Sequence, residues 1–294
     1  MDLPIPDPVA ASQETPPFGL LRPTLQAAPI ILASPHSGRD YPDAFIEAAR
    51  LDRLALRRSE DGFVDELFAG AVEHGVPLLR ATFPRAYCDP NREAWELDPA
   101  MFEDELPAWV NTSSPRVGAG LGTIARVVAS GEAIYRRKLH FAEAEARVRD
   151  CWQPYHDALG GLIAETRRRF GACLLIDCHS MPSGHVNRRD VTPDFVLGDV
   201  HGTACAPRIT RLVEQTLREL GYSIRRNDPY AGGYVTRHYG RPREGTHALQ
   251  IELARPLYMD EGRMEKLPRF AQVQRDLSTL IANLVAAAPS LLAA

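Results

Sequence analysis

Two histidines of the sequence follow short apolar runs. His36 comes directly after the run at 29–34, and His179 lies at the end of the run that begins at Ala172. Runs of this length are typical of strands that are buried on both faces of a sheet. Ligands in open α/β folds bind outside the carboxyl ends of such strands. Two histidines and one carboxylate at this edge predict a catalytic zinc site, because a fourth ligand position stays open for water.

The candidates for the carboxylate are Glu60 and Asp61, in the sequence RRSEDGFVDELF at 57–68. This segment has the pattern of a helix start, which Ser59 can cap. Acidic residues in a first turn also complement the helix dipole, and that role alone suffices for one of the two. The residue pattern therefore leaves Glu60 and Asp61 open as the third metal ligand.

A general base is predicted at Glu252. The run 246–254 has the pattern of a strand, and strand alternation sends Gln250 and Glu252 to the same side. The apolar neighbours of Glu252 argue against a solvated surface position. A carboxylate beside a metal-activated water is the usual base for hydrolysis.

Strand alternation also sorts the residues around His179. Asp177 is expected on the same face as His179, where its carboxylate can hold the imidazole ring. Cys178 is expected on the opposite face. This placement argues against the alternative of a cysteine hydrolase that uses the Cys178 thiol.

One predicted substrate-binding segment is PRAYCDPNRE at 84–93, which follows a further apolar run. Asp-Pro-Asn is a turn signal, and forming a turn is a sufficient role for it. Arg85 and Arg92 near a strand end can nevertheless bind a substrate carboxylate bidentately, with Asn91 beside them.

The second predicted substrate-binding segment is the loop at 230–242, which is rich in glycine, aromatic residues and arginine. It lacks the spacing of a phosphate-binding loop, so nucleotide binding is not indicated. A lid or a substrate-contact loop is favoured, with Arg237 and His238 as the candidate contacts.

The elements that must position these residues alternate along the chain. The strand candidates are 29–34, 76–82, 172–178, 194–199, 222–225 and 247–253. The helix candidates are 60–74, 131–170, 206–220 and 262–288, and Pro154 is expected to kink or break the second of them. This alternation predicts an α/β sheet with helices on both faces. We expect an irregular, proline-rich arm at 1–28 and a single domain at 29–294.

The composition excludes several classes of protein. The net charge of −4 gives no basic patch for nucleic acid, and no apolar run reaches the roughly 18 residues that span a membrane. The N-terminus has no pattern of a secretory signal. Five cysteines without paired spacing indicate reduced thiols and a cytoplasmic protein.

Taken together, the motifs resemble those of the N-formylglutamate amidohydrolase family. The matching segments are SPHSGRDYP (34–42), RRSEDGFVDELF (57–68), PRAYCDPNRE (84–93), IDCHS (176–180), DFVLGD (194–199) and HALQIELARPLYMDE (247–261). The family looks like a distant relative of the zinc carboxypeptidases and aspartoacylase. The resemblance implies their fold, a mixed and mostly parallel sheet flanked by helices, with zinc at its carboxyl edge.

The resemblance also implies roles for individual residues. His36 and His179 match the two zinc-binding histidines, and Glu252 matches the catalytic glutamate. Asn91 and Arg92 match the pair that receives the substrate α-carboxylate in the relatives. The third ligand is less well matched, since the carboxypeptidases place it three residues after the first histidine, where this chain has Arg39. Asp61 is preferred to Glu60, and Arg85 or an arginine of the 237–243 loop is left for the second substrate carboxylate.

The implied activity is hydrolysis of N-formyl-L-glutamate to formate and L-glutamate, a step in histidine degradation, by a catalytic domain at 29–294. Zinc is the expected cofactor, with another divalent metal as an alternative. The expected partner is a small anionic N-acyl amino acid, and the sequence predicts no oligomeric state. Alternatives are a deacylase of another N-acyl amino acid, a small carboxypeptidase, and a metal- or amino-acid-binding protein without catalysis.

Overall fold

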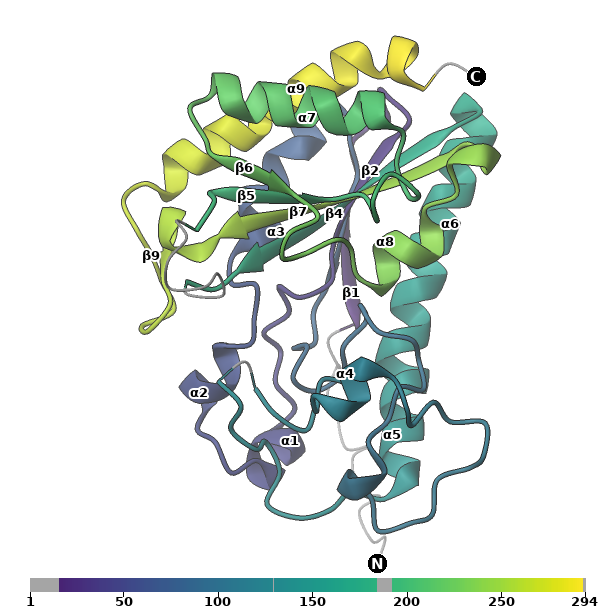
Figure 1. Cartoon of the computed structure of the whole chain (residues 1–294), viewed down its shortest axis with the longest axis vertical. Helices are drawn as coiled ribbons and strands as arrows, with labels where there is room; N and C mark the ends of the chain where they lie inside the picture. The colour runs from purple at the N-terminus through teal and green to yellow at the C-terminus, as the bar shows by residue number, and fades with distance from the viewer. Residues whose placement is uncertain (1–15, 129, 184–191, 293–294) are drawn as a thin grey trace, which may run out of the picture.

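A seven-stranded mixed sheet forms the centre of the protein (Figure 1). The computed structural model describes residues 16–128, 130–183 and 192–292. The strand order is β1 (Phe18–Leu21), β3 (Leu78–Ala81), β2 (Ile30–Ser34), β4 (Cys173–Met181), β7 (Thr246–Ala254), β5 (Phe195–Gly198) and β6 (Ile224–Arg226). Only the pairs β1/β3 and β5/β7 of this sheet are antiparallel. The predicted α/β fold with a mixed, mostly parallel sheet is confirmed.

The four strands β3, β2, β4 and β7 are parallel neighbours in the middle of the sheet. Their carboxyl ends therefore meet at one edge. In the register of β4 and β7, His179 lies opposite Glu252. His36 follows the end of β2, so three of the predicted functional residues arrive at the same edge from three adjacent strands.

Helices cover both faces of the sheet, and strand alternation divides the core accordingly. On one face, Leu174 and Ile176 of β4 pack in a cluster with residues of α3 (Val64–Leu67), α7 (Pro207–Glu219) and α9 (Phe270–Leu291). On the other face, Cys173 and Leu175 pack with residues of α6 (Gln153–Phe170) and α8 (Tyr234–Tyr239). Because both faces are covered, β4 reads as a continuous apolar run in the sequence.

Long connections follow β2 and β3 and form a smaller layer beyond the sheet, in the lower half of Figure 1. They contain α1 (Asp43–Ala48), α2 (Arg53–Arg57) and α4 (Pro115–Gly118). A separate hydrophobic cluster stabilises part of this layer: Tyr41, Phe45, Ala49, Leu56, Ala86, Ala125, Val128 and Ile134. The layer carries residues that close the site at the edge of the sheet.

The helix expected at 60–74 is shorter than predicted. It divides into α3 and a 3₁₀ segment, Ala69–His74. The residue before α3 is Phe63 with a φ of 62°, so Ser59 does not cap the helix. The left-handed conformation of Phe63 turns the chain sharply. The helix therefore begins only at Val64, and Asp61 lies in a non-helical turn.

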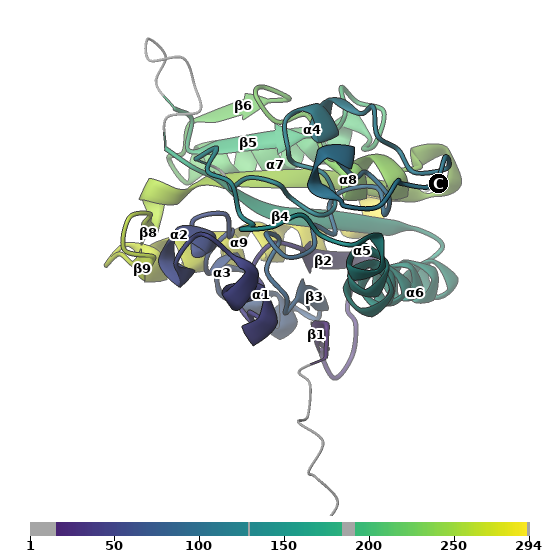
Figure 2. The ribbon, with the colours of Figure 1, turned by 90° about the horizontal axis from the view of Figure 1, so that it is seen from below.

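The stretch expected as a helix at 131–170 begins later. Helical structure starts at Phe141 with α5 (Phe141–Arg147), passes through a π-helical turn at Val148–Trp152 and continues as α6 (Figure 2). Pro154 lies in the first turn of α6, where its missing N–H is tolerated. The helix runs from the π-helical turn into α6 without the break that was expected at Pro154.

The two ends of the described chain also differ from expectation. Residues 18–21, within the arm expected to be irregular, form β1 and pair antiparallel with β3, while residues 1–15 lie outside the described part. The helix expected at 262–288 begins only at Phe270, because residues 259–266 form the small hairpin of β8 (Met259–Asp260) and β9 (Glu265–Lys266). Within the described ranges, no helix has both the length and the apolar character needed to cross a membrane.

The turn that carries His36 depends on Gly38. A methyl group at Gly38 would overlap the backbone carbonyl of Phe83, whereas a methyl group at Gly160 in α6 would meet no atom within 4 Å. We expect Gly38→Ala to lower the free energy of unfolding by about 1–3 kcal/mol, the usual cost of overpacking. The control Gly160→Ala should stabilise by roughly 0.5–1 kcal/mol, since alanine is the better helix former. Urea unfolding of both variants measures the difference, and equal stability of Gly38→Ala and the wild type would contradict the close packing.

Candidate active site

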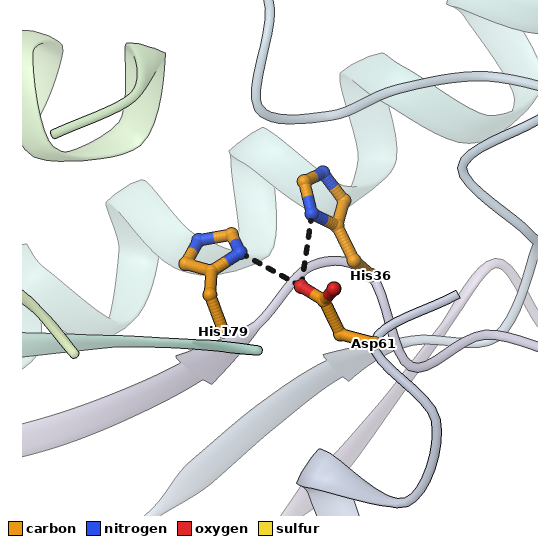
Figure 3. A group of neighbouring side chains, drawn as sticks. All are labelled: His36, Asp61 and His179. Carbon is orange, nitrogen blue, oxygen red and sulfur yellow. Dashed lines mark hydrogen bonds and ion pairs between the residues drawn. The ribbon is translucent and has the colours of Figure 1, made fainter. Parts of the chain in front are cut away.

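His36, Asp61 and His179 converge at the carboxyl edge of the sheet (Figure 3). The Oδ2 atom of Asp61 lies 3.3 Å from Nδ1 of His36 and 3.0 Å from Nδ1 of His179. All three side chains are buried, and one ligand atom from each lies within 4.8 Å of the others. Two imidazole nitrogens and one carboxylate oxygen facing one another form a donor set of the kind that binds zinc.

The other ring nitrogen of each histidine is held by a second carboxylate. Nε2 of His36 lies 2.7 Å from Oδ1 of Asp89, and Nε2 of His179 lies 2.9 Å from Oδ1 of Asp177. In neutral imidazoles these contacts place the proton on Nε2 and leave the Nδ1 lone pairs directed at the space beside Asp61. Carboxylates orient metal-binding histidines in this way in many metalloproteins. The residues present therefore fit a bound zinc ion, with His36, Asp61 and His179 holding it.

Asp61 is positioned by hydrogen bonds from distant parts of the chain. Its N–H donates to the carbonyl of His36 at 3.0 Å, and the Ser37 hydroxyl donates to its carbonyl at 3.2 Å. Its Oδ1 accepts hydrogen bonds from Ser180 and Arg255, each at 3.2 Å. Burial alone would raise the pKa of Asp61, but its contacts with the rings of His179 and His36 hold it well below its usual range. The carboxylate is therefore ionised, and its Oδ2 faces the Nδ1 atoms of both histidines.

Glu60 points away from the two histidines. Its Oε1 accepts hydrogen bonds from the Tyr41 hydroxyl at 2.9 Å and from Nε of Arg57 at 3.1 Å. Of the two carboxylates that the sequence left open, the structure brings Asp61, and not Glu60, to the histidines.

A cavity of about 510 Å³ opens at this edge, and His36, Asp61 and His179 line it together with Glu252. Gln250 donates to Oε1 of Glu252 at 2.7 Å, as expected for two residues on one side of β7. Burial raises the pKa of Glu252 to about 7. A carboxylate with this pKa can accept and return a proton near neutral pH.

Arg85, Asn91 and Arg92 also line the cavity, as predicted. Nη2 of Arg85 lies 2.8 Å from Oδ2 of Asp89. Nε of Arg92 donates to the carbonyl of Leu121 at 2.8 Å, and Asn91 Oδ1 accepts from the N–H of Val235 at 2.8 Å. The turn at 89–92 thus serves both as a support for His36 and as a cationic wall of the cavity.

The amino-terminal end of α6 holds this turn in place. Nε1 of Trp152 donates to the carbonyl of Arg92 at 3.0 Å, and Nε2 of His156 lies 2.8 Å from the carbonyl of Pro90. Burial lowers the pKa of His156 to about 4, so the ring is neutral and donates from Nε2, with Nδ1 facing the Tyr239 hydroxyl at 2.9 Å. Trp152 ends the π-helical turn, and such turns recur at functional sites.

The loop at 230–242 contributes only part of what was predicted. Tyr230 and Arg237 line the cavity, but His238 does not. The His238 ring instead stacks on Tyr234, with ring centroids 4.9 Å apart. The expectation for His238 is wrong. Arg237 and His238 are successive residues of α8, where neighbouring side chains point about 100° apart, so only Arg237 faces the cavity.

The Cys178 side chain packs in the core on the face of the sheet opposite His179, as alternation predicted. Burial raises the pKa of its thiol well above the usual value. A buried, protonated thiol on the far face of the sheet does not reach the cavity, so the site is not that of a cysteine hydrolase.

Sequence reasoning missed Asp89 and Arg255. Asp89 lies in the connection after β3, eight residues beyond Ala81, and the Asp-Pro-Asn signal explained it as part of a turn. Its only sequence signal was its position after a strand of the parallel set. Arg255 directly follows β7, and nothing in the sequence indicated that it reaches the carboxylate of Asp61.

Comparison with known proteins shows the family of the chain. Residues 28–259 match the sequence profile of the family described as N-formylglutamate amidohydrolase. The chain belongs to the N-formylglutamate amidohydrolase family. An N-formylglutamate deformylase of Pseudomonas aeruginosa is 30% identical over 79% of this chain and 83% of its own length. The enzyme of the same name from Pseudomonas putida is 29% identical over 79% of this chain and 82% of its own length.

Two solved structures agree with the fold. The N-formylglutamate amidohydrolase from Ralstonia eutropha JMP134 is 40% identical and superposes with a TM-score of 0.89, covering 94% of this chain and 99% of its own. A protein from Agrobacterium tumefaciens, 18% identical, has a TM-score of 0.62 over 93% of this chain and 96% of its own, which shows the shared fold alone.

Substitution of the two neighbouring acidic residues separates their roles. We expect Asp61→Asn to weaken zinc binding by more than about 100-fold, because loss of a ligand exceeds the loss of a supporting residue. Glu60→Gln, the matched control, should leave zinc affinity close to that of the wild type. Competition with a chromophoric chelator measures both affinities. Retention of wild-type affinity by Asp61→Asn, or its loss in Glu60→Gln, would contradict the assignment.

Proposed function

We propose that this protein is a zinc-dependent amidohydrolase that cleaves N-formyl-L-glutamate to formate and L-glutamate in the degradation of histidine. The observation that carries the proposal is one cavity that joins the His36–Asp61–His179 centre, the Glu252 carboxylate and several arginines. The names of the family and of its similar members support the substrate. None of the five cysteines, all of them among the described residues, forms a disulfide, which is in keeping with a cytoplasmic protein.

The chemistry divides between the metal centre and Glu252. When bound, zinc supplies a Lewis acid that polarises the formyl oxygen and lowers the pKa of the attacking water. Glu252 takes a proton from that water as it attacks the formyl carbon. Glu252 then returns the proton to the amide nitrogen, the C–N bond breaks, and formate and the free amine of glutamate leave. Gln250 fixes one oxygen of Glu252 throughout, so the other is available for the proton.

The arginines orient the substrate. Arg92 and Asn91 receive the α-carboxylate, and Arg237 contributes to binding of the second carboxylate. Arg85 lines the same cavity, and the charges of Asp89, Asp61 and Glu252 raise its pKa. From there it stabilises the negative charge that develops on the formyl oxygen. Binding both ends of the substrate brings the formyl group to the reacting groups and makes the attack effectively unimolecular.

Two alternative functions would use the same cavity, one with a different substrate and one without catalysis. A deacylase of another N-acyl amino acid, or a small carboxypeptidase, would use the same groups on a different substrate. A metal- or amino-acid-binding protein would bind glutamate without turnover. The raised pKa of Glu252 and its place opposite His179 favour catalysis over binding alone.

Glu252→Gln tests the proposed base. The variant keeps the shape of the side chain but cannot accept a proton. We expect kcat for N-formyl-L-glutamate to fall by about 10²- to 10⁴-fold, while the affinity for L-glutamate stays close to that of the wild type. Formate release and calorimetry of glutamate binding measure the two effects. Wild-type turnover in Glu252→Gln would remove Glu252 from the mechanism.

Cys178→Ala tests the remaining nucleophile. Because the thiol lies in the core and not in the cavity, kcat and kcat/KM should not change. Loss of the buried sulfur should lower the free energy of unfolding by about 1–2 kcal/mol. Formate release and urea unfolding check the two expectations, and a large loss of turnover in a folded variant would reinstate a cysteine hydrolase.

A further inference from the structure

Three arginines of the cavity contact a carboxylate of the protein, and two others do not. Arg85 and Arg92 share Asp89, at 2.8 Å and 3.7 Å. Arg255 pairs with Asp61 at 3.2 Å. These contacts leave the inner end of the cavity with its cations matched to carboxylates of the protein.

Arg116 and Arg237 line the same cavity without such a partner. Among the residues that the structure describes, no carboxylate lies within ion-pair distance of either guanidinium. Nε of Arg237 donates to the carbonyl of Gly232 at 3.1 Å, and Arg116 is exposed in α4. Two unmatched positive charges in a cavity attract an anion, and a ligand with two carboxylates supplies the matching charge.

The backbone links Arg116 to Arg92. The N–H of Leu121 donates to the carbonyl of Arg116 at 2.8 Å, and the carbonyl of Leu121 accepts from Nε of Arg92 at 2.8 Å. Burial and the charges of Arg85 and Arg116 lower the pKa of Arg92, in keeping with guanidinium groups that are close enough to repel one another. The backbone of Leu121 therefore joins the main chain of Arg116 to the guanidinium of Arg92.

Apolar side chains line the same part of the chain's cavity wall as Arg116. Ala119, Leu121, Ala125 and Val127 line the cavity together with Arg116. They offer a surface for methylene groups that separate two carboxylates, while Arg116 and Arg92 offer cations in the same cavity. N-acyl amino acids with an acidic side chain have this pattern of charge and apolar carbon.

We propose that Arg116 binds the side-chain carboxylate of the substrate and selects N-acyl amino acids with an acidic side chain. This inference rests on the proposed function, since it assigns the second carboxylate of the same substrate. The hydrogen bond from an arginine to a carboxylate is charge-assisted. It is stronger than the hydrogen bond from the same arginine to a neutral amide of the same shape. Arg116 is thus a specificity-determining residue, and its loss affects acidic substrates and not neutral ones.

The test compares L-glutamate with L-glutamine in the zinc-loaded protein. Calorimetry gives the dissociation constants of both for the wild type, Arg116→Met, Arg237→Met and the control Arg243→Met. Arg243 is exposed and does not line the cavity. We expect Arg116→Met to reduce the preference for glutamate about tenfold while glutamine binding stays close to that of the wild type. Arg243→Met should keep the wild-type preference.

The outcomes separate the two proposals. An unchanged preference in Arg116→Met, an equal loss for both ligands, or a loss confined to Arg237→Met overturns the role of Arg116. A wild type that prefers glutamate but releases no formate from N-formyl-L-glutamate overturns the proposed function and leaves the subsite standing. Where formate is released, the ratio of kcat/KM for N-formyl-L-glutamate to that for N-formyl-L-glutamine should fall in Arg116→Met by the same factor.

Discussion

The contact of one buried carboxylate with two buried imidazoles is the interaction on which the site depends. Asp61, His36 and His179 come from different segments and are nearly excluded from water. Charge in such a place is tolerated only when it is paired and hydrogen-bonded. Each of the three groups has a further partner that meets this requirement: Asp89 for His36, Asp177 for His179 and Arg255 for Asp61.

Residues that support this contact also line the cavity, so the orientation of the His36 ring and the position of the cavity's arginines depend on the same groups. Asp89 holds the His36 ring and pairs with Arg85 and Arg92. Trp152 and His156 fix the carbonyls of the same turn from the end of α6. A change in the turn therefore reaches both the metal-facing nitrogen of His36 and the guanidinium groups.

The sequence alone could predict the residues that end or lie on strands, because parallel strands bring their carboxyl ends to one edge. This logic placed His36, His179 and Glu252 together and put Cys178 on the far face. It could not choose between Glu60 and Asp61, because that choice follows from a left-handed turn at Phe63 and hydrogen bonds to residues 36 and 37. Residues in irregular connections, Arg116 and Asp89 among them, have no periodicity that a pattern can detect. The same irregularity explains the error at 131–140, where apolar spacing predicted a helix that isolated β-bridges replace.

The most direct test of the proposed centre is anomalous diffraction at the zinc edge from crystals of the zinc-loaded protein. The expected result is one anomalous peak between Nδ1 of His36, Nδ1 of His179 and Oδ2 of Asp61, with Nε2 of each ring still on Asp89 and Asp177. A peak at other residues, or zinc on the Nε2 atoms with those two aspartates displaced, would contradict a metal centre built on the contact with Asp61.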